Sequence, residues 1–504
     1  MSESILQSAW HGLVLVLSWP NILYPVIGTL LAMAFAFVPG LSGVTLMALA
    51  ISFTLNWEPL PILLVFGAFI GGATFMGSVT AILFNIPGTT PSAATMIDGY
   101  PMARQGHAKT AIGCSAMSSA LGSTFGILVL IALIPVMRRA ILAFGPPEFL
   151  MLAVWGLVTI AVITTRASMV KGLAAGGIGF LISFIGFDPR TAELRYTLGS
   201  PYLHDGLGTV PVFLGIFALA EMIHLSATGR RTISGGRRME ELKGSIWKGA
   251  ASVFRNFGLF LRSSIIGTVV GMIPAVGGTV AGFVAYGQAV LTAREGKERF
   301  GRGDIRGVLA PEAAHDAKDG ASLVPTLAFG VPGSEGTALL LGVLTLHGLI
   351  PGKELLTTRL DLVFVLIWSL FLSNWMTSLL GVATVGQLTR LTVIRTELLI
   401  PFISGLAVLG AYVSNARIED VAIALLFGVC GYYMKKQGWP RVPLVLALVL
   451  GPLFENNLHI TLRLRQLGRI RIWSQPIAAF LMLLTLATLA LPFIQARLSR
   501  RARP

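Results

Sequence analysis

The chain has 504 residues, of which 54% are apolar and only 12% are charged, and its mean hydropathy is +0.77. A soluble domain carries about 25% charged residues, so this composition excludes most soluble proteins and predicts an all-α polytopic membrane protein. The formal net charge is +15. The basic residues gather in loops and at the C-terminus, a pattern typical of cytoplasmic loops that face anionic membrane lipid, and not of a surface that binds nucleic acid.

The N-terminal sequence MSESILQSAWHGLVLVLSW has no basic stretch and no small-residue cleavage site, so we do not expect a cleaved signal peptide. About 11–13 membrane-embedded segments follow, several of them short or interrupted. Clear ones are Phe149–Thr165, Leu362–Leu380 and Ile477–Phe493. Cys114 and Cys430 lie far apart in apolar segments, so we interpret them as small packing residues without a disulfide or metal site.

The chain divides at a basic stretch. We expect a first transmembrane repeat at residues 1–228, a basic cytoplasmic linker at 229–255, and a second repeat at 256–504 that ends in helices and a basic cytoplasmic tail. A second basic stretch, Arg294–Lys318, is also expected to be a cytoplasmic loop. Within it, the charges of His315–Asp319 alternate in sign, so a solvated loop end is expected there and not a metal site.

Each half contains two similar Pro-Gly breaks in the same order. Val38–Gly43 reads VPGLSG and Ile273–Gly278 reads IPAVGG, and their prolines are 235 residues apart. Asn85–Thr89 reads NIPGT and Gly330–Ser334 reads GVPGS, with prolines 245 residues apart. Pro and Gly interrupt helices, and such breaks survive in a membrane only where they are buried or line a wet cavity. We therefore predict two inverted repeats with broken helices or re-entrant hairpins.

The breaks also predict the binding site. Paired breaks in a transporter point to a site near the membrane midplane, where helix N-termini face an anion. Hydroxyl, amide and free carbonyl groups around them suit a carboxylate or a transient sodium ion. A set of Pro kinks and tight Gly-mediated helix crossings remains the alternative. We expect the breaks at Pro39-Gly40, Pro87-Gly88, Pro274 and Pro332-Gly333 to converge. The candidate substrate- or ion-binding residues are Pro39, Gly40, Ser42, Gly43, Ser78, Thr80, Asn85, Pro87, Gly88, Thr89, Ser92, Gly277, Gly278, Pro332, Gly333, Ser334, Glu335 and Thr337.

Several segments resemble the large membrane subunit of the tripartite tricarboxylate transporters, the TctA-like family. The most specific is Gly77–Gly106, GSVTAILFNIPGTTPSAATMIDGYPMARQG. FGPPEF at Phe144–Phe149, APEAA at Ala310–Ala314 and PTLAFGVPGS at Pro325–Ser334 follow in the family's order. The likeness covers nearly the whole chain. One departure is Ala275, where we expect glycine from the family.

The resemblance implies a secondary transporter of the bacterial inner membrane that imports small tri- or dicarboxylates. It implies two protein partners, a small membrane subunit and a periplasmic solute-binding protein. An ion gradient, typically of sodium, would drive uptake, with no other cofactor. Glu335, beside the second break, is the candidate for the coupling ion.

Two other classes of function are alternatives to carboxylate transport. A membrane-embedded transferase would need clustered catalytic residues, but the sequence has no GxSxG or HExxH motif, and no GxxxxGK[ST] loop for an ATP-driven pump. A channel would differ by gradient-independent flux, and the repeated breaks favour alternating access over an open pore. Three acidic residues beside Gly or Pro are interpreted as turn residues, namely Asp98, Asp188 and Asp205.

Overall fold

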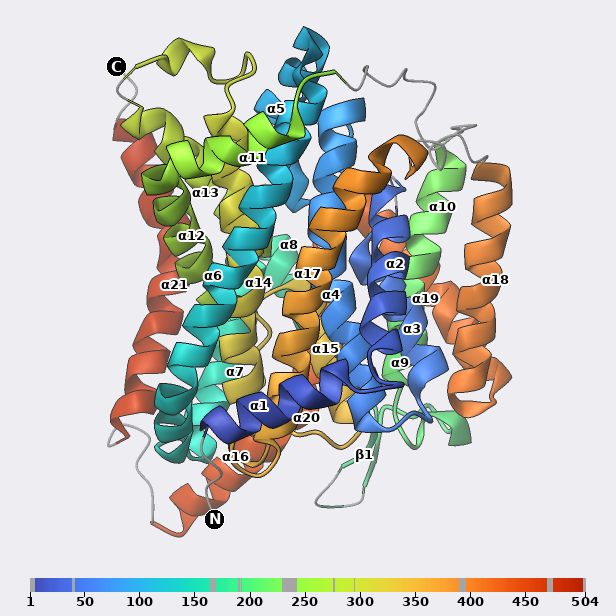
Figure 1. Cartoon of the computed structure of the whole chain (residues 1–504). Coiled ribbons are helices and arrows are strands. Elements are labelled where there is room, and N and C mark those ends of the chain that lie inside the picture. The colour runs from blue at the N-terminus through green and yellow to red at the C-terminus, as the bar shows by residue number, and fades with distance from the viewer. Residues whose placement is uncertain are drawn as a thin grey trace.

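The protein is described here from a computed structural model, which covers residues 5–38, 41–163, 169–188, 191, 193–228, 243–274, 277–293, 295–388, 396–468 and 475–501. Nearly all of these residues are helical (Figure 1). The helices are α1 (Ile5–Leu17), α2 (Leu23–Phe37), α3 (Gly43–Thr54), α4 (Pro59–Phe84), α5 (Met96–Met102), α6 (Ala108–Leu142), α7 (Pro146–Ile163), α8 (Met169–Ser183), α9 (Thr209–Phe213), α10 (Ala220–Ala227), α11 (Ile246–Arg255), α12 (Phe257–Met272), α13 (Gly277–Thr292), α14 (Arg306–Phe329), α15 (Glu335–Leu346), α16 (Lys353–Thr357), α17 (Leu360–Leu388), α18 (Thr396–Asn415), α19 (Ile418–Lys436), α20 (Val442–Gln466) and α21 (Pro476–Arg501).

Short helical turns and one small hairpin complete the described structure. The 3-10 turns are η1 (Pro91–Ala93), η3 (Pro201–Leu203) and η5 (Lys297–Arg299), and the π-helical turns are η2 (Ala103–His107) and η4 (Leu214–Leu219). Strands β1 (Gly186–Phe187) and β2 (Leu194–Arg195) pair antiparallel, with Gly186 opposite Arg195.

Six helical stretches of the described residues are long and apolar enough to cross a membrane, and the bent pair α11–α12, with an angle of 80°, would make a seventh. Shorter apolar helices such as α2, α3 and α15 accompany them. The predicted all-helical, multi-pass class is therefore confirmed. The three segments singled out from the sequence fall on α7, α17 and α21. Of the cysteines, Cys114 is buried in α6 but Cys430 is exposed on α19, so the packing interpretation holds only for Cys114.

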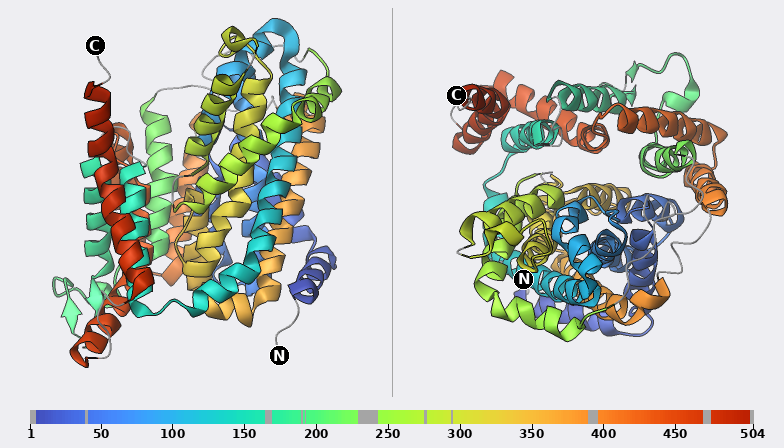
Figure 2. Two further views of the ribbon diagram at one scale, coloured as in Figure 1. Left: turned by 90° about the vertical axis from the view of Figure 1, so that its left-hand side faces the viewer. Right: turned by 90° about the horizontal axis from the view of Figure 1, so that it is seen from above.

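The helices form two layers, which are seen separately from above (Figure 2). The larger layer contains α1–α6 and α11–α17, and the thinner one contains α7–α10 and α18–α21. The long helices α4 and α14 are in the larger layer, where α4 packs on α2 and α17, and α14 packs on α6 and α12. Each half of the chain contributes to both layers.

Close helix crossings hold the larger layer together through small residues. Gly67 and Gly71 of α4 lie against the backbone of α17, at Leu366 and Leu370. On α14, the carbonyl group of Ala317 fits against Gly126 of α6. An added Cβ atom at any of these glycines would collide with the backbone of the neighbouring helix. These contacts therefore fix the packing of α4 on α17 and of α14 on α6.

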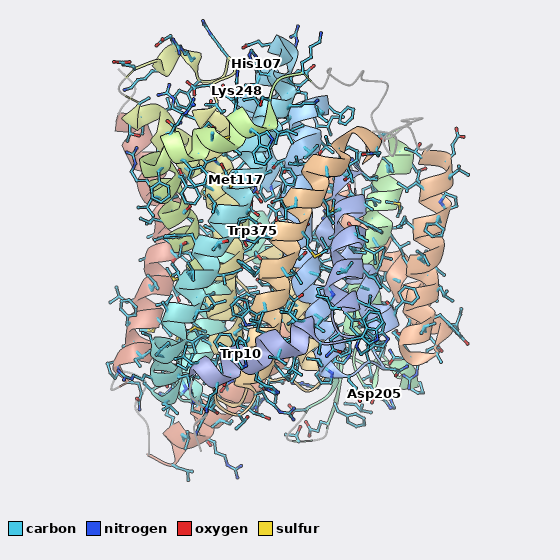
Figure 3. The ribbon with its side chains drawn as sticks, in the orientation of Figure 1. Trp10, His107, Met117, Asp205, Lys248 and Trp375 are labelled. Carbon is cyan, nitrogen blue, oxygen red and sulfur yellow. The ribbon has the colours of Figure 1, made fainter. Side chains whose placement is uncertain are left out.

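Two amphipathic helices lie across opposite ends of the bundle (Figure 1). In α1, Gly12 and Val16 are buried while Trp10 is 68% exposed. In α11, Gly249 is buried while Trp247 is 82% exposed. Figure 3 places Trp10 and Lys248, the neighbour of Trp247, near these two ends. Tryptophan is enriched at membrane–water boundaries, so we expect α1 and α11 to lie at the two surfaces of the membrane.

The structure corrects the predicted loop at Arg294–Lys318. Residues 306–329 form α14, and nearly all of this helix is buried. His315, Asp316, Lys318 and Asp319 are therefore inside the bundle and not at a solvated loop end. The error came from reading the charges as a surface feature, although the small residues around them allow tight helix packing. The last ten residues of the predicted linker form α11, and the division of the chain at this linker remains a prediction.

Candidate functional site

The first-half break follows α4. The helix ends at Phe84, and Asn85 adopts the left-handed conformation with φ 55° and ψ 37°. The chain then turns back, so that the Gly88 amide donates a hydrogen bond to the Gly77 carbonyl at 3.1 Å. A Cβ atom on Gly88 would collide with the carbonyl oxygen of Ala36, near the end of α2. Glycine is therefore required here by the close approach of two backbones.

The second-half break follows α14 in the same way. The helix ends at Phe329, and Gly330 is left-handed with φ 67° and ψ 22°. A Cβ atom on Gly333 would lie 2.8 Å from the carbonyl oxygen of Gly271, near the end of α12, and 2.7 Å from Ser322. Ser322 stands 245 positions after Gly77, as Gly333 stands after Gly88. The two breaks therefore have matching neighbours as well as matching sequences.

The predicted hydroxyl groups of the first half cluster at its break. The Oγ1 atom of Thr89 lies 2.7 Å from the Oγ atom of Ser92, and Ser78 donates to Ser92 at 3.3 Å. Thr80 instead donates to the Gly77 carbonyl at 2.8 Å. Ser78, Thr80 and Ser92 are buried. The structure thus brings three of the predicted hydroxyls, Ser78, Thr89 and Ser92, together.

In the second half, the candidate hydroxyls cap a helix. Ser334 is the N-cap of α15. Its amide donates a hydrogen bond to the Thr337 hydroxyl at 2.8 Å, and its own hydroxyl accepts one from the Thr337 amide at 3.3 Å. Ser42 likewise caps α3 by accepting from the Thr45 amide at 3.2 Å. Glu335 is in the first turn of α15 and is half-buried. The hydroxyls of Ser42, Ser334 and Thr337 are therefore engaged in capping helices.

The segments around the breaks contact the other half of the chain at two places. Gly278, at the start of α13, packs on Pro91 in the first-half break and on the Lys318 side chain. Gly336, beside the second-half break, packs on Met47 of α3. Gly43 sits against Ala73 of α4, and Gly277 is left-handed with φ 71°. Pro39, Gly40 and Ala275 lie outside the described residues, so the convergence of all four breaks remains a prediction.

Sequence reasoning missed a group of buried ionisable side chains on α14. Glu312 accepts hydrogen bonds from the hydroxyls of Ser115, at 2.6 Å, and Thr95. His315 has its Nε2 atom 3.0 Å from an Asp316 oxygen and 3.7 Å from a Glu312 oxygen. All three acidic and basic side chains of this group are fully buried.

The next turn of α14 continues the charged group. Lys318 forms an ion pair with Asp319. Asp319 also accepts a hydrogen bond from Thr74 of α4 at 3.2 Å, and Asp316 accepts one from Asn374 of α17 at 3.1 Å. The sequence did carry a signal for this face, because Glu312, His315, Asp316 and Asp319 follow the helical spacing of three to four residues.

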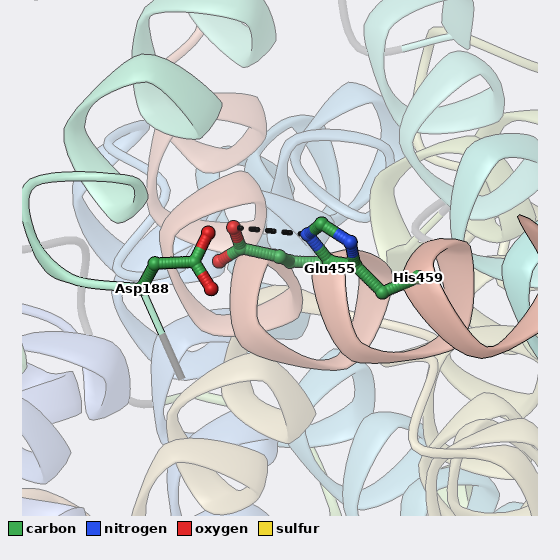
Figure 4. A group of neighbouring side chains, drawn as sticks. All are labelled: Asp188, Glu455 and His459. Atoms are coloured by element: carbon green, nitrogen blue, oxygen red, sulfur yellow. Dashed lines mark ion pairs between the residues drawn. The ribbon is translucent and has the colours of Figure 1, made fainter. Parts of the chain in front are cut away.

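A second acidic group with a histidine lies at the end of α20, where Figure 4 shows Asp188, Glu455 and His459 together. The guanidinium group of Arg195 lies 3.2 Å from Asp188 and 2.5 Å from Glu455. This cation already pairs with both carboxylates. The group therefore fastens the β1–β2 hairpin to α20 and does not favour a metal ion.

The three aspartates interpreted as turn residues behave differently. Asp188 accepts from the Thr191 amide beside the hairpin, and Gly206 after Asp205 is left-handed, so both are in turns. Asp98 is instead a buried residue of α5. Its carboxylate accepts from the amides of Gly303 and Asp304, at 2.8 and 2.9 Å, and holds the segment that precedes α14. The turn interpretation is wrong for Asp98.

Comparison with known proteins decides what these features belong to. Residues 22–446 match the family described as "Tripartite tricarboxylate transporter TctA family". The chain belongs to this TctA family. It is a multi-pass membrane transporter component and not an enzyme, and the resemblance inferred from the motifs is confirmed.

Two proteins of Agrobacterium vitis are similar to this TctA-family chain. One is an uncharacterized 52.8 kDa protein of the TAR-I ttuC′ 3′ region, 30% identical over 482 residues, which cover 95% of each chain. The other is an uncharacterized protein of the TAR-II ttuC′ 3′ region, 30% identical over 235 residues, or 47% of this chain and 97% of that protein. No solved structure matches this chain.

Proposed function

We propose that this TctA-family protein carries small carboxylates across the bacterial inner membrane as the translocating subunit of a three-part uptake system. A periplasmic solute-binding protein would deliver the substrate, and a small membrane subunit would complete the complex. An inward ion gradient, of sodium by the family resemblance, would drive uptake. The C-terminus and the basic linker at 229–255 would face the cytoplasm, because basic loops stay on that side.

The observation that carries this proposal is the pair of breaks with matching backbone neighbours. After Asn85 and Gly330, each chain segment turns back against the end of a short helix of the same half. Irregular backbone at membrane depth needs partners that lipid cannot supply. Two such places, in contact with the other half of the chain, suit a midplane site for an anionic substrate.

We infer that the two halves, divided as predicted into residues 1–228 and 256–504, are inverted repeats. Support comes from α1 of the first half and from α11, which immediately precedes residue 256, because these two helices lie at opposite ends of the bundle (Figure 1). Gly12 of α1 packs on the Asp361 carbonyl of α17, and Gly249 of α11 packs on the Thr110 carbonyl of α6. Asp361 and Thr110 are 251 positions apart, as are Trp375 and Thr124, which share a 3.0 Å hydrogen bond.

A pseudo-two-fold axis explains the contacts between equivalent positions. Two residues one repeat apart can touch only if the axis passes between them. Thr74 and Asp319 are 245 positions apart, which is the offset of the two Pro-Gly breaks, and they share a 3.2 Å hydrogen bond. The contact between Thr124 and Trp375 fits the same axis for α6 and α17.

Within this architecture, Ser92 is the residue we expect to bind the carboxylate or its coupling ion most directly. It is fully buried and contacts both Ser78 and Thr89. Asn85 is a less clear test, because alanine is strained in its left-handed conformation. A hydrogen bond to a charged group contributes about 1.5–3 kcal/mol.

The test is uptake of radiolabelled citrate and other carboxylates into proteoliposomes that contain the protein with its two partners. Ser92→Ala should weaken apparent affinity roughly ten- to hundredfold at an unchanged protein level. Ser119→Ala, another buried serine but in α6, is the control and should keep normal affinity. Normal affinity in Ser92→Ala would remove Ser92 from the site. Equal uptake with every ion gradient collapsed would indicate a channel instead.

A further inference from the structure

The buried charges of α14 have no counterpart in α4, the helix that occupies the equivalent place in the first half. Counting back 245 positions from Glu312, His315, Asp316 and Asp319 gives Gly67, Ile70, Gly71 and Thr74. All four are buried, Gly67 and Gly71 pack on α17, and α4 contains no charged side chain. Packing of this kind of helix therefore does not require the charges of α14.

Burying these charges is costly, because an ion taken out of water loses its solvation. The α14 group holds three carboxylates, on Glu312, Asp316 and Asp319, against one lysine, Lys318. Lys318 is paired with Asp319. Glu312 and Asp316 therefore face each other across His315 without another described cation in contact. The group is short of positive charge unless cations bind to it.

Several buried polar atoms around His315 lack a hydrogen-bond partner in the part of the chain that the structure describes. Among the described residues, neither nitrogen of the His315 ring has a well-aligned hydrogen-bond partner, and the same is true of Asp316 Oδ2 and Asn374 Oδ1. Each of these side chains is at least 99% buried. Imidazole is a poor ligand for sodium, which prefers oxygen, but it is the side chain that gains and loses protons most readily near neutral pH.

We propose that Glu312, His315 and Asp316 form a proton-binding site, which takes up and releases a proton in each cycle of carboxylate transport. This inference rests on the proposed transport function and adds a proton to the ion gradient considered there. Ionisable residues buried in membrane proteins commonly serve as proton relays. Sodium remains the expectation for the hydroxyl-rich breaks.

A direct connection joins this site to the expected substrate site. Thr95 donates its hydroxyl hydrogen bond to Glu312, and it follows Thr89 and Ser92 in the same short segment after the first break. A proton gained by Glu312 or His315 changes the charge that this segment faces. On the next turn, Lys318 touches Gly278 at the start of α13. Proton binding, the position of the first-half break and the start of α13 are therefore linked through few contacts.

Other titratable groups face the site from the neighbouring helices and belong in any account of its pH dependence. They are Cys114 of α6, Asp98 of α5, Tyr286 of α13, which donates to Asp98 at 2.9 Å, and Glu335 of α15, which interacts electrostatically with Lys318 and Arg441. None of them contacts His315 directly in the described residues. Asp98 approaches α14 at Gly307, two turns before His315.

The experiment compares net uptake with exchange in proteoliposomes that contain the complete transporter. Internal pH is followed with a pH-sensitive dye, and an acid-outside pH gradient is imposed with equal sodium on both sides. The wild-type protein should accumulate labelled carboxylate at least tenfold more with the gradient than without it, and the lumen should acidify. His315→Gln should lose both responses but keep exchange of internal for external carboxylate, which needs no net proton movement.

His347→Gln is the matched control, because the partners of His347 among the described residues are two backbone carbonyl groups, those of Val343 in α15 and Thr54 at the end of α3. It should behave as wild type. Proton-coupled uptake that survives in His315→Gln would overturn the inference, as would wild-type uptake that ignores the pH gradient. If wild-type protein shows no carboxylate exchange, the proposed function itself fails. Asp316→Asn is the second variant, and loss of both variants from the membrane would show that the group is structural.

Discussion

Helices α4 and α14, which both precede a Pro-Gly break, differ sharply in chemistry. Both are buried, both end in a left-handed residue before a Pro-Gly break, and both are crossed closely by a long helix from the other half. Yet α4 is apolar apart from a few hydroxyls, while α14 carries five ionisable side chains between Glu312 and Asp319. The shared features belong to the architecture. The differing ones point to what the protein does with that architecture.

The largest effect is expected when a charged residue is introduced into α4. Gly71→Asp places a carboxylate at the position equivalent to Asp316, where an added Cβ atom would already be 2.5 Å from the Leu370 carbonyl. An unpaired buried charge costs several kcal/mol, and the clash adds to it. We expect the variant to be nearly absent from membranes by immunoblot. Gly71→Ala adds the same Cβ atom without the charge and should retain more protein than Gly71→Asp.

Removing one partner of the Lys318–Asp319 ion pair should have the next largest effect. Lys318→Met leaves a buried carboxylate unpaired, which costs about 3–5 kcal/mol, and the melting temperature in detergent should fall clearly. The double variant Lys318→Met, Asp319→Asn removes both charges and should recover most of this loss. A double variant as unstable as Lys318→Met would mean that packing of the lysine stem, and not its charge, stabilises α14.

The two break glycines test whether the architecture is shared. Gly88→Ala and Gly333→Ala each push a Cβ atom into a carbonyl group of a short helix, on Ala36 and Gly271 respectively. Overpacking of this kind costs about 1–3 kcal/mol. We expect both variants to lose thermal stability by similar amounts. Gly287→Ala, where an added Cβ meets no neighbour, should be neutral, and a neutral Gly333→Ala would weaken the case for equivalent breaks.

The smallest effect is expected for the hydrogen bond between α4 and α14. Thr74→Val keeps the shape of the side chain but removes its hydrogen bond to Asp319. Because Lys318 still pairs with Asp319, the loss should be about 1.5 kcal/mol. Measured together with Asp319→Asn in a double-mutant cycle, the two changes should be non-additive. Additive effects would show that Thr74 and Asp319 do not interact in the membrane.

The sequence predicted the breaks better than the charges. Pro87-Gly88 and Pro332-Gly333 were recognisable because Pro and Gly act locally on the backbone, and their repetition needs no knowledge of the fold. The charges of α14 were misread because a charge is judged by its surroundings, which are set by distant helices. Ala313 and Ala317, spaced for close contact with Gly122 and Gly126, were the available sign that this stretch is buried.

Capping explains part of the difference between predicted and observed roles. Ser334 and Thr337 were selected as candidates for substrate binding, but both are engaged in capping α15. Ser78, Thr89 and Ser92 bond instead to one another. A hydroxyl in the sequence does not reveal which of these arrangements it will adopt, since the choice depends on where the next helix begins.

The packing of α4 against α17 has a consequence for biosynthesis of the protein. Gly67 and Gly71 form a stripe that is closed by Leu366 and Leu370, which are synthesised almost 300 residues later. At translation rates of about 5–20 residues per second, α4 waits roughly 15–60 s in the membrane before its partner emerges. During biogenesis the first half must therefore be held by lipid, the insertion machinery or a chaperone, and a nascent chain stopped before α17 should be a substrate for membrane proteases.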